Sequence, residues 1–232
     1  MDLLRRIYYY FVNLYLHFYI QADSSIILVV PFSSLGGLKD IKKRITVKKI
    51  TRKPPLYTQH LKCHVILEEG SHLHGGILEL GQDSQLYLTK NSSFVFGDVF
   101  STGDFSIIMV SGDSTLKVSD NFHVMNFFRL SCDNAMVIGK NFLGSDFVTI
   151  RDNDGHPIEF EDGSKNDPKP VVIGDQVWIG LHSTILKGAV LGDMVVVGAN
   201  SLVTKKVQKN WVVAGNHLRQ VNKIKKWERF YD

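Results

Sequence analysis

A branched aliphatic residue recurs at every sixth position of the stretch Val171–Val207. A small or β-branched residue lies two positions before each of them, and glycine most often follows. A period of six is neither the 3.6 of a helix nor the 2 of a strand, so an amphipathic helix or a simple hairpin cannot generate it. Short fixed periods of this kind indicate a β-solenoid. The recurring aliphatic residues are Ile173, Ile179, Ile185, Leu191, Val197 and Val203.

The period predicts a coil built from short strands separated by bends. Three units of six would close one triangular coil, with the aliphatic residue pointing inward and stacking on its counterpart one coil away. The smaller residue, such as Ser183, would also point inward near a corner. Gly144 falls in an inward slot where a bulky residue is expected, and Phe142 or Phe147 would fill the gap.

Composition and charge limit the partners of the chain. Its 232 residues are 44% hydrophobic and 22% charged, which is typical of a globular protein rather than a disordered one. The net charge is +4, with the excess in the first third, between Arg5 and Lys53. Three interpretations stay open: a solvated basic surface, contact with an anionic membrane, or an acidic polysaccharide partner. We expect no nucleic-acid partner, because no recognised nucleic-acid module accompanies these charges.

The two cysteines, Cys63 and Cys132, form no CxxC or Cys/His cluster. Two buried thiols in a reducing compartment, and no metal site, are therefore expected.

We divide the chain into three parts. Residues 1–60 form an N-terminal aromatic and basic segment, whose first twenty residues favour a helix that either packs on the protein or lies at a membrane interface. Residues 61–217 form the solenoid domain, interrupted at 151–170 by an external loop rich in acids, glycine and proline. Residues 218–232 are predicted to be a basic amphipathic helix that caps the open core.

Three stretches together carry a resemblance to a known family. They are IGKNFLGSDFVTIRDNDGHPI (138–158), NDPKPVVIGDQVWIG (166–180) and ILKGAVLGDMVVVGANSLVTK (185–205), followed by VVAGN. They resemble the hexapeptide-repeat acyltransferases, in particular the O-acetyltransferases of bacterial capsule and lipopolysaccharide pathways. The resemblance implies an all-β, left-handed parallel β-helix, whose hand departs from the usual crossover rule.

The resemblance also implies a homotrimer that transfers acetyl from acetyl-CoA, without a metal, to a sugar hydroxyl of a surface polysaccharide or its precursor. A cytoplasmic location follows, with peripheral contact at the inner membrane as a further expectation.

His156 is the candidate catalytic residue. Transfer to a hydroxyl needs a base that is neutral near pH 7, and histidine suits this task. No G-x-S-x-G nucleophile motif occurs, which agrees with direct transfer in a ternary complex. By resemblance, the histidine of the DGH motif faces the thioester in a cleft between subunits. Asp154 would orient or polarise His156, and Arg151 and Asp152 would contact the acceptor or fix the loop.

Trp178 is expected to face outward, where it would line the pantetheine or acceptor path or pack on the next subunit. The resemblance places the pantetheine arm along the coils, and amides at its glycines could also stabilise an oxyanion. Either Lys205 or Lys206 would meet the phosphates of CoA. The family's proline and lysine near the adenine are replaced by His217 and Arg219. The remaining donor-site candidates are Gly180, Gly198, Ala199 and Gly215.

Three other functions stay open on the sequence. The acceptor could be a small molecule such as serine, a simple sugar or an amino-sugar nucleotide. A zinc carbonic anhydrase on the same fold would need three converging histidines, with His123, His156 and His182 available. The solenoid could also be a scaffold that has lost its activity.

Overall fold

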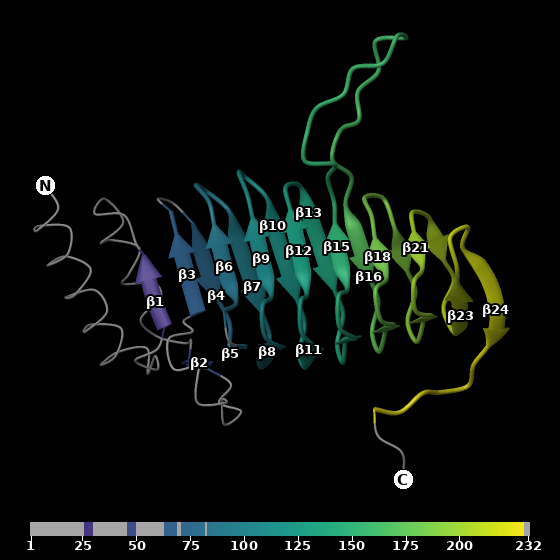
Figure 1. Cartoon of the computed structure of the whole chain (residues 1–232), viewed down its shortest axis with the longest axis horizontal. Coiled ribbons are helices and arrows are strands. Elements are labelled where there is room, and N and C mark those ends of the chain that lie inside the picture. Colours follow the sequence, from purple (N-terminus) through teal and green to yellow (C-terminus); the bar gives the residue numbers. More distant parts are fainter. Residues whose placement is uncertain (1–25, 30–45, 50–62, 69–70, 82, 230–232) are drawn as a thin grey trace, which may run out of the picture.

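The computed structural model describes residues 26–29, 46–49, 63–68, 71–81 and 83–229, and these residues form a parallel β-solenoid. Successive strands pass from a first to a second to a third sheet and back, so that each strand pairs in parallel with its counterpart one coil away. Figure 1 shows the coils stacked along the long axis. The all-β solenoid predicted from the six-residue period is confirmed. In the described part of the chain, no helix is long and apolar enough to cross a membrane.

The strands divide among the three sheets as follows. The first sheet contains β1 (Ile26–Val29), β3 (Cys63–Leu67), β6 (Gln85–Leu88), β9 (Ile107–Val110), β12 (Arg129–Cys132), β15 (Thr149–Arg151), β18 (Thr184–Ile185) and β21 (Leu202–Val203). The second contains β4 (His72–His74), β7 (Ser93–Phe96), β10 (Thr115–Val118), β13 (Ala135–Ile138), β16 (Val171–Ile173), β19 (Val190–Leu191) and β22 (Lys206–Val207). The third contains β2 (Thr46–Lys49), β5 (Ile77–Leu80), β8 (Val99–Thr102), β11 (Phe122–Val124), β14 (Leu143–Gly144), β17 (Trp178–Ile179), β20 (Val196–Val197), β23 (Trp211–Ala214) and β24 (Arg219–Lys223).

The coils shorten along the chain, which explains why the repeat is clear only near the C-terminus. Contacts between neighbouring coils join residues 22 apart at Asn91 and Asp113, but 18 apart at Asp175 and Asp193. The longer coils contain strands of four residues, such as β9 and β10, where the later coils have strands of two. A period of six therefore appears only where each side of the triangle is six residues long.

The core consists of inward-facing columns, one from each sheet. In the first sheet, fully or almost fully buried aliphatic residues are paired coil to coil. The third sheet instead stacks the buried rings of Phe100, Phe122 and Phe142, with centroids 4.3 and 4.9 Å apart. Phe142 lies next to Gly144, where an added Cβ would come within 2.8 Å of Val124, so Phe142 fills the gap and Phe147 stays outside. The aliphatic column of the first sheet is Leu86, Ile108, Leu130, Ile150, Ile185 and Val203.

Buried polar side chains at the corners are satisfied by the backbone. The hydroxyls of Ser183 and Ser201 both donate to the carbonyl of Gly198, at 2.8 and 2.6 Å. This pairing removes the cost of burying a hydroxyl without a partner. The small inward residue that recurs in the repeat is therefore part of the bonding between coils.

The C-terminus differs from the prediction of a capping helix. Leu218 is followed by β24, which pairs antiparallel with β23, and residues 224–229 are not helical. Without β24, the backbone amides and carbonyls along the outer edge of β23 would have no partners within the sheet. A strand can supply these hydrogen bonds, whereas a helix cannot. The third sheet is thus extended by one antiparallel strand at the C-terminal end of the solenoid.

The N-terminal boundary also lies earlier than residue 61. β1 pairs with β3 and β2 pairs with β5, so parts of the segment 1–60 extend the first and third sheets. The aromatic stretch 1–20, with its predicted helix, lies outside the described residues.

Cys132 is buried with a free thiol, and burial raises its pKa well above the usual range.

We predict that Phe122→Ala lowers the free energy of unfolding by about 3–5 kcal/mol, because it removes the central ring of a buried stack and leaves a cavity. Urea denaturation followed by circular dichroism measures the change. The matched control is Phe160→Ala, which removes an exposed ring on the external loop and should cost at most about 1 kcal/mol. Equal effects of the two substitutions would contradict the assignment of the core.

Candidate functional site

The loop between β15 and β16 projects from the edge between the first and second sheets (Figure 1). Its two limbs meet beyond the base through an antiparallel bridge between Glu159 and Lys165, whose side chains form an exposed ion pair at 3.8 Å. Loops carried on a rigid scaffold commonly bear function. The break in the repeat corresponds to this loop, which begins immediately after Arg151, the last residue of β15, and not at residue 151 as expected.

Asp152 anchors the base of the loop. Its side chain is fully buried, and its two carboxylate oxygens accept hydrogen bonds from the backbone amides of Asp133 and Asn134, at 2.8 and 2.9 Å. The side-chain amide of Asn153 also donates to Asp152 and to the hydroxyl of Ser131. A buried carboxylate with these partners fixes the loop and does not face an acceptor. Of the two roles expected for Asp152, the structure supports loop fixation.

Asp154 does not contact the imidazole of His156 in this structure. One of its oxygens accepts a hydrogen bond from Nδ2 of Asn166 at 2.9 Å and an ion-paired hydrogen bond from Nζ of Lys187. The bond from Lys187, followed by that from Asn166, holds the pKa of Asp154 below its usual range. The expectation that Asp154 orients the His156 ring is therefore replaced by a role in joining the two limbs of the loop.

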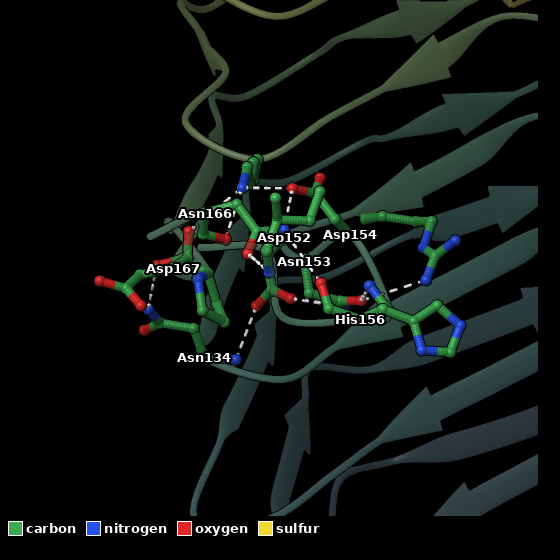
Figure 2. A network of polar contacts seen from close by, with 12 residues as sticks. Asn134, Asp152, Asn153, Asp154, His156, Asn166 and Asp167 are labelled. Carbon is green, nitrogen blue, oxygen red and sulfur yellow. Dashed lines mark hydrogen bonds and ion pairs between the residues drawn. The ribbon is translucent and has the colours of Figure 1, made fainter. Parts of the chain in front are cut away.

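His156 is exposed and held through its backbone. Nδ2 of Asn166 donates to the His156 carbonyl at 3.0 Å, and Oδ1 of Asn166 accepts a hydrogen bond from the amide of Ile158. Figure 2 shows the imidazole directed away from the carboxylate of Asp154 and from Asn166. The ring is therefore available to an incoming group while its main chain is fixed on both sides.

Arg151 and Asp133 lie next to this network. Nη2 of Arg151 donates to Oδ1 of Asn153 at 3.1 Å, whereas its buried Nε has no hydrogen-bond partner among the described residues. Partial burial, and then the Asp152 carboxylate, raise the pKa of Asp133, with Arg151 acting in the opposite direction. Asn166 lies in the loop itself and begins the second of the quoted stretches, but no role was assigned to it from the sequence. Asp133 precedes β13, and the stacking of coils brings it to the base of the loop.

Trp178 lies on the third sheet, away from the edge that carries the loop. Its side chain is 38% exposed, and its Nε1 donates to the hydroxyl of Ser145 at 3.3 Å. The ring lies 6.1 Å from that of Trp227, which exchanges two hydrogen bonds with Gln176. The outward position predicted for Trp178 is confirmed, and part of its surface faces the chain's own C-terminal segment.

That C-terminal segment runs back over the third sheet. Between Trp227, Arg229 and the strands β11 and β14 it borders a cavity of about 390 Å³. His123 lies in this cavity, and burial, followed by the charge of Arg229, lowers its pKa. Among the residues that the structure describes, no cysteine or second histidine lines the cavity.

An exposed aromatic stack marks the edge between the third and first sheets. The rings of Phe105, Phe127, Phe147 and His182 stack in succession, with centroids 5.1, 4.5 and 4.4 Å apart. The three phenylalanines are among the exposed large hydrophobic residues. The loop with His156, the tryptophan and this stack therefore belong to different sides of the prism, and a single chain does not assemble them into one site.

The glycines near the predicted donor site are used by the coils themselves. The amides of Gly180 and Gly198 donate to the carbonyls of Val197 and Val213, at 2.7 and 2.8 Å. A Cβ on Gly180 would come within 2.8 Å of the backbone of the next coil. These two amides are therefore engaged and do not point at an oxyanion, although Ala199 is exposed.

The basic residues that are candidates for binding the CoA phosphates and adenine lie near the C-terminal end of the solenoid. Lys205 and Lys206 are exposed, and Lys206, Lys209 and Lys223 line a groove of about 560 Å³. Gly215 adopts a left-handed conformation (φ 98°) in the turn after β23, and Arg219 pairs with Ala214 across the β23–β24 hairpin.

The three histidines considered for zinc are separated within the chain. His123 lies on β11, His156 on the loop and His182 at the aromatic edge. Among residues with described side chains, no three His, Cys, Asp or Glu residues are grouped as metal ligands.

Comparisons with known proteins agree with this architecture. Residues 170–205 match the family model described as the hexapeptide repeat of succinyl-transferase. The chain is 31% identical over 157 residues to WbbJ of Escherichia coli, which is assigned to lipopolysaccharide biosynthesis as an O-acetyl transferase, covering 62% of this chain and 80% of WbbJ. It is 32% identical over 126 residues to the galactoside O-acetyltransferase of Escherichia coli, covering 53% of this chain and 62% of that protein.

Solved structures show the same fold. The polysialic-acid-specific acetyltransferase NeuO superposes with a TM-score of 0.53 at 18% identity, covering 90% of this chain and 91% of NeuO. The polysialic acid O-acetyltransferase OatWY gives a TM-score of 0.55 at 19% identity, covering 91% of this chain and 87% of OatWY. The parallel solenoid, its projecting histidine loop and the extent of the match to WbbJ together lead to one conclusion: this chain belongs to the hexapeptide-repeat O-acetyltransferases.

Proposed function

We propose that this protein transfers the acetyl group of acetyl-CoA to a sugar hydroxyl of a bacterial surface polysaccharide or of its precursor. The observation that carries the proposal is the position of His156, which is exposed on a loop whose backbone is fixed to an O-acetyltransferase solenoid. The names of the relatives support an acyl transfer to saccharides, since they include enzymes of lipopolysaccharide biosynthesis and of galactoside acetylation.

In this mechanism His156 acts as the general base. The neutral imidazole accepts the proton of the acceptor hydroxyl while that oxygen attacks the thioester carbonyl, and collapse of the tetrahedral intermediate breaks the C–S bond. The imidazolium then returns its proton to the departing CoA thiolate. Asp133 and Arg151, beside the loop, would bind the acceptor. We assign Asp152 and Asp154 to the loop itself, because their oxygens are already engaged.

The donor would extend from the loop toward the C-terminal coils. Trp178 offers an apolar surface to the pantetheine arm, and the exposed Lys205 and Lys206 offer charge to the phosphates. The turn at Gly215 and the exposed Arg219 form the adenine end. The absence of large side chains at Gly180, Gly198 and Ala199 would let the pantetheine arm lie close to the backbone of the coils. The amides of the two glycines bond to the next coil.

A homotrimer would complete the site. The loop leaves one edge of the prism and Trp178 lies on the sheet opposite that edge, so side-by-side packing of three chains would bring the loop of one chain to the tryptophan of the next. The exposed phenylalanine stack supplies apolar surface for such contacts. We also propose the left-handed coil sense, on the family resemblance.

A small-molecule acceptor is the second candidate, favoured by the similarity to the galactoside enzyme. Testing glycan polymers and simple galactosides side by side separates the two.

We predict that His156→Ala lowers kcat for acetyl transfer by at least about 100-fold, because general-base catalysis contributes 10²–10⁴-fold. Release of free CoA thiol from acetyl-CoA in the presence of saccharide acceptors measures the rate, and mass spectrometry of the glycan identifies the product. His74→Ala, which changes an exposed histidine on β4 outside the proposed site, is the control and should retain most of the activity. A wild-type chain with no activity toward any acceptor would favour a non-catalytic scaffold.

We further predict subunit complementation. His156→Ala and Trp178→Ala chains, each with little activity alone, should recover about one quarter of wild-type activity after mixed refolding, since random mixing places both intact residues at one seam in four. Light scattering of the eluted protein gives the oligomeric state. Mixed samples no more active than the single variants, or a monomer at micromolar concentration, would contradict the shared site.

A further inference from the structure

Lys187, which no sequence motif pointed to, joins both limbs of the loop to the next coil. It follows β18, and its Nζ donates to the carboxylate of Asp154 on one limb and to the carbonyl oxygens of Asn166 and Asp167 on the other, at 2.7 and 3.3 Å. These three acceptors account for all three protons of the ammonium group. Because the solenoid coil that carries Lys187 is rigid, the cation fixes the loop relative to the scaffold.

Asn166 transmits this restraint to the catalytic residue. Its side-chain amide donates to both Asp154 and the carbonyl of His156, while its Oδ1 accepts from the amide of Ile158. Every hydrogen-bonding direction of the side chain, apart from one lone pair, is thereby used to hold the segment around His156. Figure 2 shows Asn166 lying between Asp154 and the backbone of His156.

The environment of Lys187 distinguishes it from the other charged pairs. Its side chain is 19% exposed, whereas the lysines of the other ion pairs among the described residues are 58 to 67% exposed. Asp154 is 35% exposed, close to the 34% of Asp120 in the Lys140 pair, so the pair is better shielded from water only on the side of Lys187. The lowered pKa of Asp154, caused first by its bond with Lys187, agrees with a strong interaction.

We infer that Lys187, acting through Asp154 and Asn166, is a positioning residue that holds the main chain of His156 in the geometry required for acetyl transfer. This inference rests on the proposed function for its catalytic consequence. The structural part, a clamp that orders residues 154–158, stands on the contacts alone. Small misplacements of a catalytic group reduce kcat more than binding, so the clamp should affect kcat and leave the KM for acetyl-CoA nearly unchanged.

The test compares Lys187→Met with Lys140→Met in the full chain. Methionine keeps the length of the side chain without its charge, and Lys140 forms an exposed pair with Asp120 at 3.2 Å, away from the loop. Hydrogen exchange of the Ile158 amide reports the clamp without any substrate, and we expect exchange about tenfold faster in Lys187→Met but unchanged in Lys140→Met. With a saccharide that the wild-type protein acetylates, kcat of Lys187→Met should fall at least about tenfold, while its KM for acetyl-CoA should change by no more than about twofold. Lys187→Arg, which keeps the positive charge, should restore much of the lost kcat.

A second variant, Asn166→Ala, removes the acceptor of the Ile158 amide itself and gives the exchange rate expected when the clamp is open. Exchange at Ile158 that is unchanged in Lys187→Met would overturn the inference. So would a loss of global stability in Lys187→Met that speeds exchange equally in the solenoid strands, because Lys187 would then support the coil rather than the loop. A wild-type protein without transferase activity, combined with faster exchange in the variants, would refute the proposed function and leave the clamp standing.

Discussion

Hydrogen bonding between successive coils is the constraint on which the rest of the structure depends. Each strand pairs in register with the strand one coil away, so backbone amides, corner serines and corner aspartates all find partners in a neighbouring coil. The interior is filled by columns of aliphatic side chains and by the stacked phenylalanine rings of the third sheet. Each coil is held by hydrogen bonds to its neighbouring coils, so the solenoid forms a rigid scaffold. Functional side chains are therefore expected on the segments that project from this scaffold.

The loop at residues 152–170 combines that stiffness with an exposed histidine. Asp152 is buried at its root, and Lys187 ties its limbs together, so His156 is presented to solvent from a fixed main chain. Fixed geometry around a catalytic group lowers the entropy that must be lost in the reaction. The carboxylates near His156 therefore act through the loop backbone, in contrast with catalytic arrangements in which a carboxylate contacts the imidazole directly.

The sequence predicted the features that depend on local periodicity. The period of six identified the solenoid, and the break after Ile150 identified the loop. The helix predicted for residues 218–232 is not formed in the described part, 218–229, because the need of β23 for an edge partner outweighed the helical pattern of the basic residues there. The partners of Asp154 were missed because its bond with Asn166, 12 residues away, depends on how the loop folds back on itself. Its bond with Lys187, 33 residues away, depends on the stacking of coils. Coils of about 22 residues also concealed the repeat in the first half of the chain.

The central claim is that His156 of one chain reaches a thioester lying beside Trp178 of another. The most direct measurement is an experimental structure of the assembled protein with acetyl-CoA bound. We predict that the imidazole of His156 lies near the thioester, with room between them for a sugar hydroxyl, and that the facing tryptophan belongs to the neighbouring chain. A structure in which acetyl-CoA lies on a surface remote from the loop, or in which His156 faces only solvent, would contradict the account.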